Sequence, residues 1–115
     1  MDLIDLVAQI QIMKVEFFIN GEEDYTTGDI TTLEQFKIEM IYYIESTLQW
    51  EYGNNHDFYE WIEDCKLVRH DDIFTTRGGT ISISSHVRLE TVKTFLKNWN
   101  RDFGDTQMVE YEISY

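Results

Sequence analysis

Residues 31–50, with the sequence TTLEQFKIEMIYYIESTLQW, decide the fold that this chain is expected to adopt. Apolar side chains recur there at spacings of three and four residues, which places them on one face of an α-helix. The members of this apolar stripe are Leu33, Phe36, Met40, Ile41, Ile44 and Leu48. Such a stripe must pack against other elements, so we expect this helix to lie at the centre of one hydrophobic core.

Both ends of this helix carry recognisable signals. Thr31 and Glu34 have the spacing of a capping box, in which each side chain accepts a hydrogen bond from the other residue's backbone N–H. At the other end, Gly53 can adopt the left-handed conformation that closes a helix. The sequence therefore predicts a helix over about residues 31–50.

The segment before this helix predicts a second short helix and a β-hairpin. Residues 2–10 have one apolar helical face. Residues 13–19 alternate between apolar and polar side chains, and Asn20-Gly21 is a hairpin signal ahead of a second strand at residues 25–27. We therefore expect a hairpin whose turn is followed by three acidic residues, 22–24.

Two more helices, a second hairpin and a final strand are predicted for residues 55–115. Asn55 and Ser85 have side chains that cap helix N-termini, and their helices are expected to end near residues 65 and 100. Turn residues 77–79 separate strands at 67–75 and 80–84, and residues 109–115 alternate as a strand. The inward side chains of the two helices are expected to be Phe58, Trp61, Ile62, Cys65, Leu89, Val92, Phe95, Leu96, Trp99 and Phe103.

This order of elements lacks the regular alternation of strand and helix that builds a parallel doubly wound sheet. We therefore expect residues 1–115 to form a single acidic α+β domain. In it, the hairpins and the C-terminal strand make an antiparallel sheet, on which three to four helices pack. A chain of 115 residues with 43% hydrophobic residues can bury one such core.

Cysteine content and the first residues bear on the cellular compartment. Cys65 is the single cysteine, so the chain cannot form an internal disulfide. Residues 1–5 lack the basic start and long apolar run of a signal peptide, and no apolar run reaches the length of a membrane span. We therefore expect a cytoplasmic protein.

Net charge is the most unusual property of the sequence. The chain has 22 acidic and 9 basic residues, which gives a net charge of −13. The excess lies wholly in residues 1–64, because residues 65–115 contain equal numbers of acidic and basic side chains. Like charges repel within a folded domain and reduce its stability, unless something else selects for the concentration of acid.

Candidate residues for catalysis or metal binding are few. Residues 70–72, His-Asp-Asp, are potential metal ligands, but neighbours in a strand point to opposite faces. Residues 64–66, Asp-Cys-Lys, with Asp57 resemble half of a nuclease metal site, although so acidic a domain would repel a phosphate substrate. Cys65 lies on an inward helical stripe, as a structural thiol does. We expect no catalytic residue, no metal and no cofactor.

The acidic surface has two interpretations. In the first it is only a solvated coat. In the second its carboxylates replace the phosphates of nucleic acid, whose duplex carries about one charge per 1.7 Å of axis. The residues expected to bind a partner are Glu22, Glu23, Asp24, Asp57, Glu60, Glu63 and Asp64.

In its size, α+β build, lone cysteine and lack of a targeting segment, the chain resembles the small acidic phage-encoded anti-CRISPR proteins that mimic DNA. The stretches EEDY (22–25) and DFYEWIED (57–64) carry the same mixture of acidic and aromatic residues. The resemblance implies an inhibitor in the host bacterial cytoplasm that binds the target-DNA or PAM-reading surface of a CRISPR effector nuclease. It also implies that the protein does not itself bind nucleic acid.

Two other functions remain open from the sequence. An immunity protein that neutralises a basic bacterial toxin nuclease would have the same acidity. An enzyme of a type without a recognisable motif is the third hypothesis. Both inhibitor hypotheses have a basic nucleic-acid-binding protein as the partner.

Overall fold

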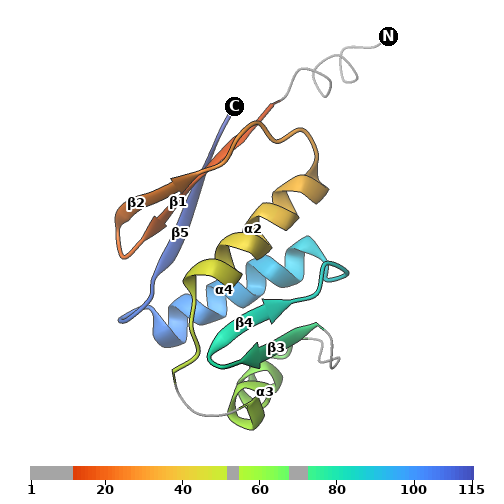
Figure 1. The fold of residues 1–115 in the computed structure, drawn as a ribbon, viewed down its shortest axis with the longest axis vertical. Helices are drawn as coiled ribbons and strands as arrows, with labels where there is room; N and C mark the ends of the chain where they lie inside the picture. The colour runs from red at the N-terminus through yellow and green to blue at the C-terminus, as the bar shows by residue number, and fades with distance from the viewer. Residues whose placement is uncertain (1–11, 52–54, 68–72) are drawn as a thin grey trace.

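A computed structural model of the protein describes residues 12–51, 55–67 and 73–115 (Figure 1). The elements in these ranges are β1 (Lys14–Ile19), β2 (Glu22–Thr26), α2 (Leu33–Thr47), α3 (Asn55–Asp64), β3 (Phe74–Arg77), β4 (Thr80–Ile83), α4 (Leu89–Phe103) and β5 (Val109–Ser114). The predicted α+β class with antiparallel strands is confirmed. The helix predicted for residues 2–10 lies outside the described residues.

The described strands form two antiparallel sheets, where the sequence predicted one. β1 lies between β2 and β5 in a three-stranded sheet, and β3 pairs with β4 in a separate hairpin. As predicted, Asn20 and Gly21 make the turn between β1 and β2, with φ of 51° and 85°. β2 contains a bulge at Asp24, because the pairing shifts between Phe17 and Phe18 of β1.

The central helix, α2, begins one residue later than the sequence predicted. Its N-cap is Thr32 in place of Thr31, and the Thr32 Oγ1 accepts a hydrogen bond of 3.0 Å from the Gln35 backbone N–H. The Gln35 Oε1 accepts in return from the Thr32 backbone N–H at 3.3 Å, so Gln35 takes the role predicted for Glu34. Leu33 is then the first helical residue. Its side chain is 65% exposed, so the prediction that it belongs to the core is wrong.

α2 ends at Thr47, three residues before the predicted end. Leu48 is extended, Gln49 forms a β-bridge with Thr80, and the Trp50 backbone N–H donates to the Gly79 carbonyl oxygen at 2.7 Å. Pairing with the β3–β4 hairpin therefore competes successfully with helix propensity at these positions. The predicted stop signal at Gly53 lies outside the described residues.

α4 also begins later than predicted, with Arg88 as its N-cap. Ser85 is therefore not the cap, and its carbonyl oxygen accepts a hydrogen bond of 2.7 Å from the Lys37 Nζ of α2. This bond ties the segment before α4 to the central helix. α4 continues to Phe103, one turn past the predicted end.

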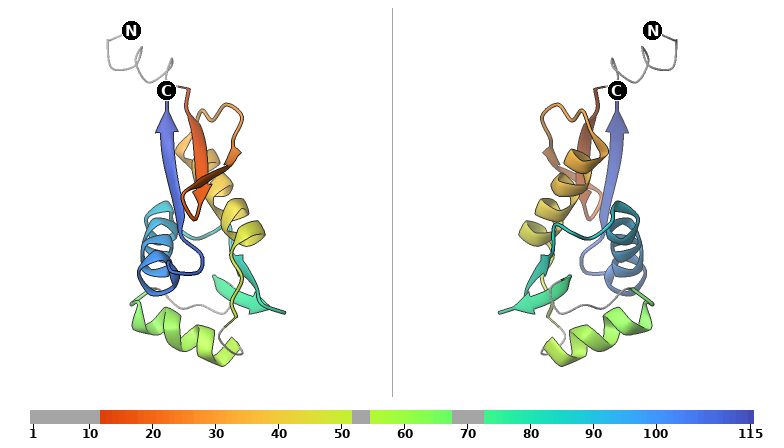
Figure 2. Two further views of the ribbon diagram at one scale, coloured as in Figure 1. Left: turned by 90° about the vertical axis from the view of Figure 1, so that its left-hand side faces the viewer. Right: turned by 90° about the vertical axis from the view of Figure 1, so that its right-hand side faces the viewer.

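The buried side chains form one core that joins the two sheets and the helices. Next to the three-stranded sheet, the rings of Phe17 and Tyr43 stack with centroids 4.2 Å apart. Next to β3–β4, the rings of α3 and α4 meet in a cluster, in which the centroids of Trp61 and Trp99 are 5.7 Å apart. Figures 1 and 2 show α2 and α4 running through the middle of the molecule between these two parts.

Candidate functional site

The seven acidic residues predicted to bind a partner lie in two separate parts of the surface. Residues 22–24 are on β2, which is an edge strand of the three-stranded sheet, and the other four are on α3. All seven residues are exposed, as predicted. Figures 1 and 2 show β2 and α3 well apart along the long direction of the molecule, so the fold does not bring these residues into one patch.

Another acidic group lies on the outer face of the three-stranded sheet, and of its members the sequence predicted only Glu23 as a binding residue. Glu16 and Phe18 share this face of β1, because strand residues two apart point the same way. The strand register places Glu112 opposite Glu16, and places Glu23 and Glu110 on either side of Phe18. We call Glu16, Glu23, Glu110 and Glu112 the acidic sheet face. The left view of Figure 2 shows the sheet in front of α2, with no described helix over this face.

The carboxylates of the acidic sheet face affect one another's protonation. The pKa of Glu16 is raised above its ordinary value of 4.5, first by a hydrogen bond with Glu23. Desolvation and the negative charges of Glu23 and Glu112 raise this pKa further. Lys14 shares this outer face of β1, but its Nζ lies 3.7 Å from a carboxylate oxygen of Asp29, which is not one of the four glutamates. The fold therefore concentrates negative charge here.

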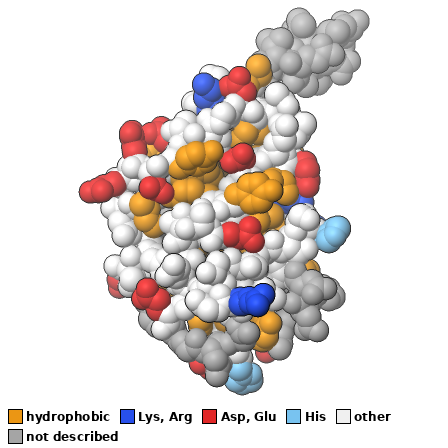
Figure 3. All heavy atoms as spheres, viewed as in Figure 1, with side chains coloured by type: hydrophobic (Ala, Val, Ile, Leu, Met, Phe, Trp, Pro, Cys, Tyr) orange, Lys and Arg blue, Asp and Glu red, His pale blue; other side chains and the backbone are white. Residues whose placement is uncertain are grey.

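A groove with a volume of about 560 Å³ lies on the other side of β2, between this strand and α2. Figure 3 shows hydrophobic side chains exposed over β2 and α2, with acidic side chains among them. The residues that line the groove are Asp24, Tyr25, Glu39, Tyr42, Tyr43, Ser46 and Thr47. We call this feature the β2–α2 groove.

Asp24, one of the predicted binding residues, also has a structural contact in the β2–α2 groove. The Tyr43 hydroxyl donates a hydrogen bond of 2.7 Å to the Asp24 Oδ2. Burial, followed by this bond to Asp24, raises the pKa of the Tyr43 phenol well above its ordinary value of 10. Tyr43 is therefore neutral at physiological pH and acts as the donor in this bond.

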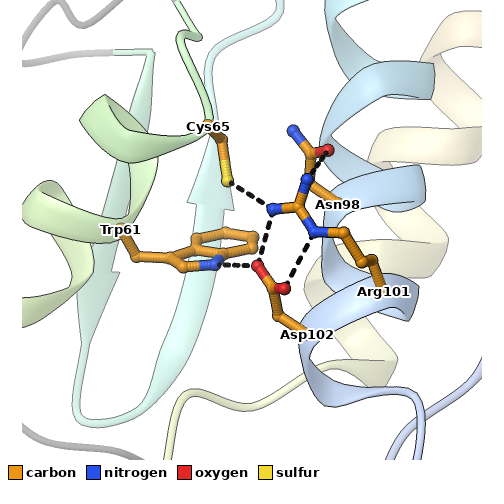
Figure 4. Close-up of polar contacts among 5 residues, drawn as sticks. All are labelled: Trp61, Cys65, Asn98, Arg101 and Asp102. Atoms are coloured by element: carbon orange, nitrogen blue, oxygen red, sulfur yellow. Dashed lines mark hydrogen bonds and ion pairs between the residues drawn. The ribbon is translucent and has the colours of Figure 1, made fainter.

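A polar cluster connects α3, which carries the other predicted residues, to α4 (Figure 4). The Trp61 Nε1–H and the Arg101 Nη2–H both donate to the Asp102 Oδ2 at 2.8 Å. The bonds from Arg101, helped by Trp61 and opposed by desolvation, lower the pKa of Asp102 to about 2. This cluster fixes the orientation of α3, and hence of its acidic face.

Cys65 belongs to the same cluster but has the properties of a structural thiol. Its Sγ lies 3.7 Å from the Arg101 Nη2, and the residue is half-buried. Burial raises the pKa of the Cys65 thiol, although the hydrogen bond from Arg101 opposes this rise. The thiol is therefore protonated at neutral pH, and so is a poor nucleophile.

Among the residues that the structure describes, no group of three or more His, Cys, Asp or Glu side chains is placed to hold a metal ion. Residues 70–72, the His-Asp-Asp sequence weighed as metal ligands, lie outside the described ranges. Within those ranges every helix is too short or too polar to cross a membrane.

Comparison of the chain with models of protein families, with curated proteins and with solved structures finds no match. The function is therefore inferred from the residues and their arrangement.

Proposed function

We propose that this protein is an inhibitor that binds the nucleic-acid-binding surface of another protein, using carboxylates in the places of phosphates. The acidic sheet face is the observation that carries the proposal. Four glutamates lie together there, and none of them forms an ion pair with a described residue. Like charges opposite one another destabilise a sheet, and a basic partner would offset this cost on binding.

The size of the acidic sheet face favours a short binding site on the partner. Neighbouring strands lie about 4.8 Å apart, so three strands span roughly 10 Å. That width corresponds to about three base pairs at 3.4 Å per nucleotide step. The partner surface that fits is therefore a short DNA-reading site rather than a channel for a long duplex.

The partner that we favour is a CRISPR effector nuclease, with the acidic sheet face on its PAM-reading surface. Such effectors read the short PAM through arginine side chains, which carboxylates can engage in bidentate ion pairs. The net charge of −13 supports this assignment, because opposite charges steer the two proteins together. The chain would then act as an anti-CRISPR protein and DNA mimic.

The alternative is an immunity protein for a basic bacterial toxin nuclease. The same small patch of carboxylates would also suit a phosphate-binding surface of such a toxin. The two functions differ in the class of nuclease that the protein binds, so an assay run on both classes separates them.

A DNA-release assay tests the proposal. The purified protein is titrated into guide-loaded effector nucleases bound to labelled target DNA and, in parallel, into toxin nucleases bound to labelled DNA. We expect displacement of DNA from one of these classes, weakening as salt is added because exposed charges are screened. Binding of the protein to DNA itself, or failure to displace DNA from either class, would show that the proposal is wrong.

A further inference from the structure

The β2–α2 groove has aromatic walls that are unusually exposed. Tyr25 on β2 is 48% exposed, and Tyr42 on α2 is 61% exposed. Tyrosine is enriched in protein interfaces because its ring gives a large contact area and its hydroxyl tolerates water. A volume of about 560 Å³ is also within the range of pockets that hold a ligand or a side chain.

The position of Tyr25 is fixed by the core beneath it. Its ring is stacked with that of Phe17, with centroids 6.4 Å apart and planes 12° apart. Phe17 is itself stacked on Tyr43, with planes 7° apart, and both of these residues are buried. The Tyr43 hydroxyl is bonded to Asp24. The groove is therefore largely preformed, which lowers the entropic cost of binding.

The charge of the groove is negative. Asp24 and Glu39 line it, and none of the lining residues is basic. Asp24 accepts a hydrogen bond from the neutral Tyr43 phenol, and within the described ranges neither Asp24 nor Glu39 forms an ion pair. Tyrosine faces and carboxylates together favour a cation.

We propose that the β2–α2 groove receives an arginine side chain of the partner protein. A planar guanidinium can stack on a tyrosine ring while it donates hydrogen bonds to a carboxylate, which the compact ammonium of lysine does less well. This inference rests on the proposed function and names the residue type that the partner presents. Since Glu23 and Tyr25 are both on β2, the partner would contact the two sides of one edge strand.

An NMR titration with short peptides tests the inference without the partner. The ¹⁵N-labelled protein is titrated with acetyl-Gly-Arg-Gly-amide, with its lysine counterpart, and with the citrulline counterpart, which is a neutral isostere. The arginine peptide is expected to cause saturable shifts at the amides of residues 24–25 and 39–47, with smaller shifts for lysine and none for citrulline. Tyr42→Ala and Glu39→Gln should each weaken binding by about two- to fivefold, the size of an exposed cation–π contact.

Glu51→Gln is the matched control, because Glu51 is exposed and lies outside the groove. This substitution removes one negative charge, as Glu39→Gln does. It should leave peptide binding unchanged, and the spectrum of each variant reports whether it folds. The inference is wrong if the shifts spread equally over the acidic sheet face, if citrulline acts as arginine does, or if Tyr42→Ala binds normally.

The DNA-release assay separates failure of this inference from failure of the proposed function. If the wild type displaces DNA and Tyr42→Ala does so at the same concentration, the groove inference is wrong while the proposed function stands. If the arginine peptide binds the groove but the wild type displaces no DNA, the arginine site stands and the proposed function fails.

Discussion

Glu16 of β1 and Glu112 of β5 lie directly opposite each other in the three-stranded sheet, although they come from opposite ends of the described chain. Glu23 of β2 adds a third carboxyl on the other side of β1, and a proton shared with Glu23 raises the pKa of Glu16. Pairs of like charge in this position destabilise a sheet. The surface proposed to bind a partner is therefore also a surface that opposes folding.

Glu16→Gln is expected to raise the thermal stability of the protein at pH 7. The pKa of Glu16 is raised in the folded state, so its ionised form opposes folding once the pH exceeds this pKa. Below the ordinary value of 4.5 Glu16 is protonated in both states, and the advantage of glutamine should disappear there. Melting temperatures of the variant and the wild type at pH 7 and pH 3.5 test this expectation.

Glu51→Gln is the control for that measurement, because Glu51 is exposed and lies away from the acidic sheet face. It should change the melting temperature less at pH 7. An equal gain for Glu51→Gln, or a gain for Glu16→Gln that persists at pH 3.5, would mean that lower net charge rather than this carboxylate cluster explains the effect.

Asp102→Asn is expected to lower stability at neutral pH, whereas Glu16→Gln is expected to raise it. In both variants the difference from the wild type should disappear at low pH. The pKa of Asp102 is lowered from 3.8 to about 2 by Arg101 and Trp61, so its ionised form favours the folded state above pH 3.8. That contribution is lost as the pH falls toward 2, and the variant and wild-type melting temperatures should converge. Asp105→Asn, an exposed change just after α4, should show no such trend. A constant difference at all pH values would contradict the ion pair.

Phe36→Ala and Leu33→Ala are expected to lower the unfolding free energy by very different amounts, although both residues belong to the predicted apolar stripe. Phe36 is 2% exposed, and its truncation should cost about 3–5 kcal/mol of unfolding free energy. Leu33 is 65% exposed, and its truncation should cost no more than about 0.5 kcal/mol. Urea unfolding of the two variants measures both values. Similar losses would place Leu33 in the core after all.

Local patterns in the sequence predicted most of the secondary structure. The alternation at 13–19 and the Asn20-Gly21 turn were sufficient for the first hairpin, and the periodicity of α2 and α4 identified most of their buried side chains. The errors lie in the number of sheets, in the bounds of β2 and β3, and at helix ends. There the outcome depends on contacts with distant residues, such as the pairing of Gln49 with Thr80 and the bond from Lys37 to Ser85.

The candidate site was harder to predict, because it depends on strand pairing. Glu110 and Glu112 lie in the part of the chain with balanced charge, and nothing in the sequence links them to Glu16. The alternation at 109–115 predicted that they face outward, but did not identify the neighbouring strand. Similarly, the exposure of Tyr42 depends on which flank of α2 the sheet leaves open, so helical spacing alone did not predict the β2–α2 groove.

The most direct test of the proposed function uses the nuclease that the DNA-release assay identifies. The affinity of this nuclease is measured for two variants of the protein that lose the same number of charges. One variant changes the acidic sheet face to glutamine at residues 16, 23, 110 and 112. The other removes the same number of charges from α3 by changes to Asn or Gln at residues 57, 60, 63 and 64. Both should fold, which melting curves can check.

Isothermal titration calorimetry at constant salt then gives the two dissociation constants. We expect the sheet-face variant to bind more than about tenfold more weakly than the wild type, a difference of about 1.4 kcal/mol, and the α3 variant to lose much less. Equal losses in the two variants, or an unchanged dissociation constant for the sheet-face variant, would contradict the claim that the acidic sheet face binds the partner.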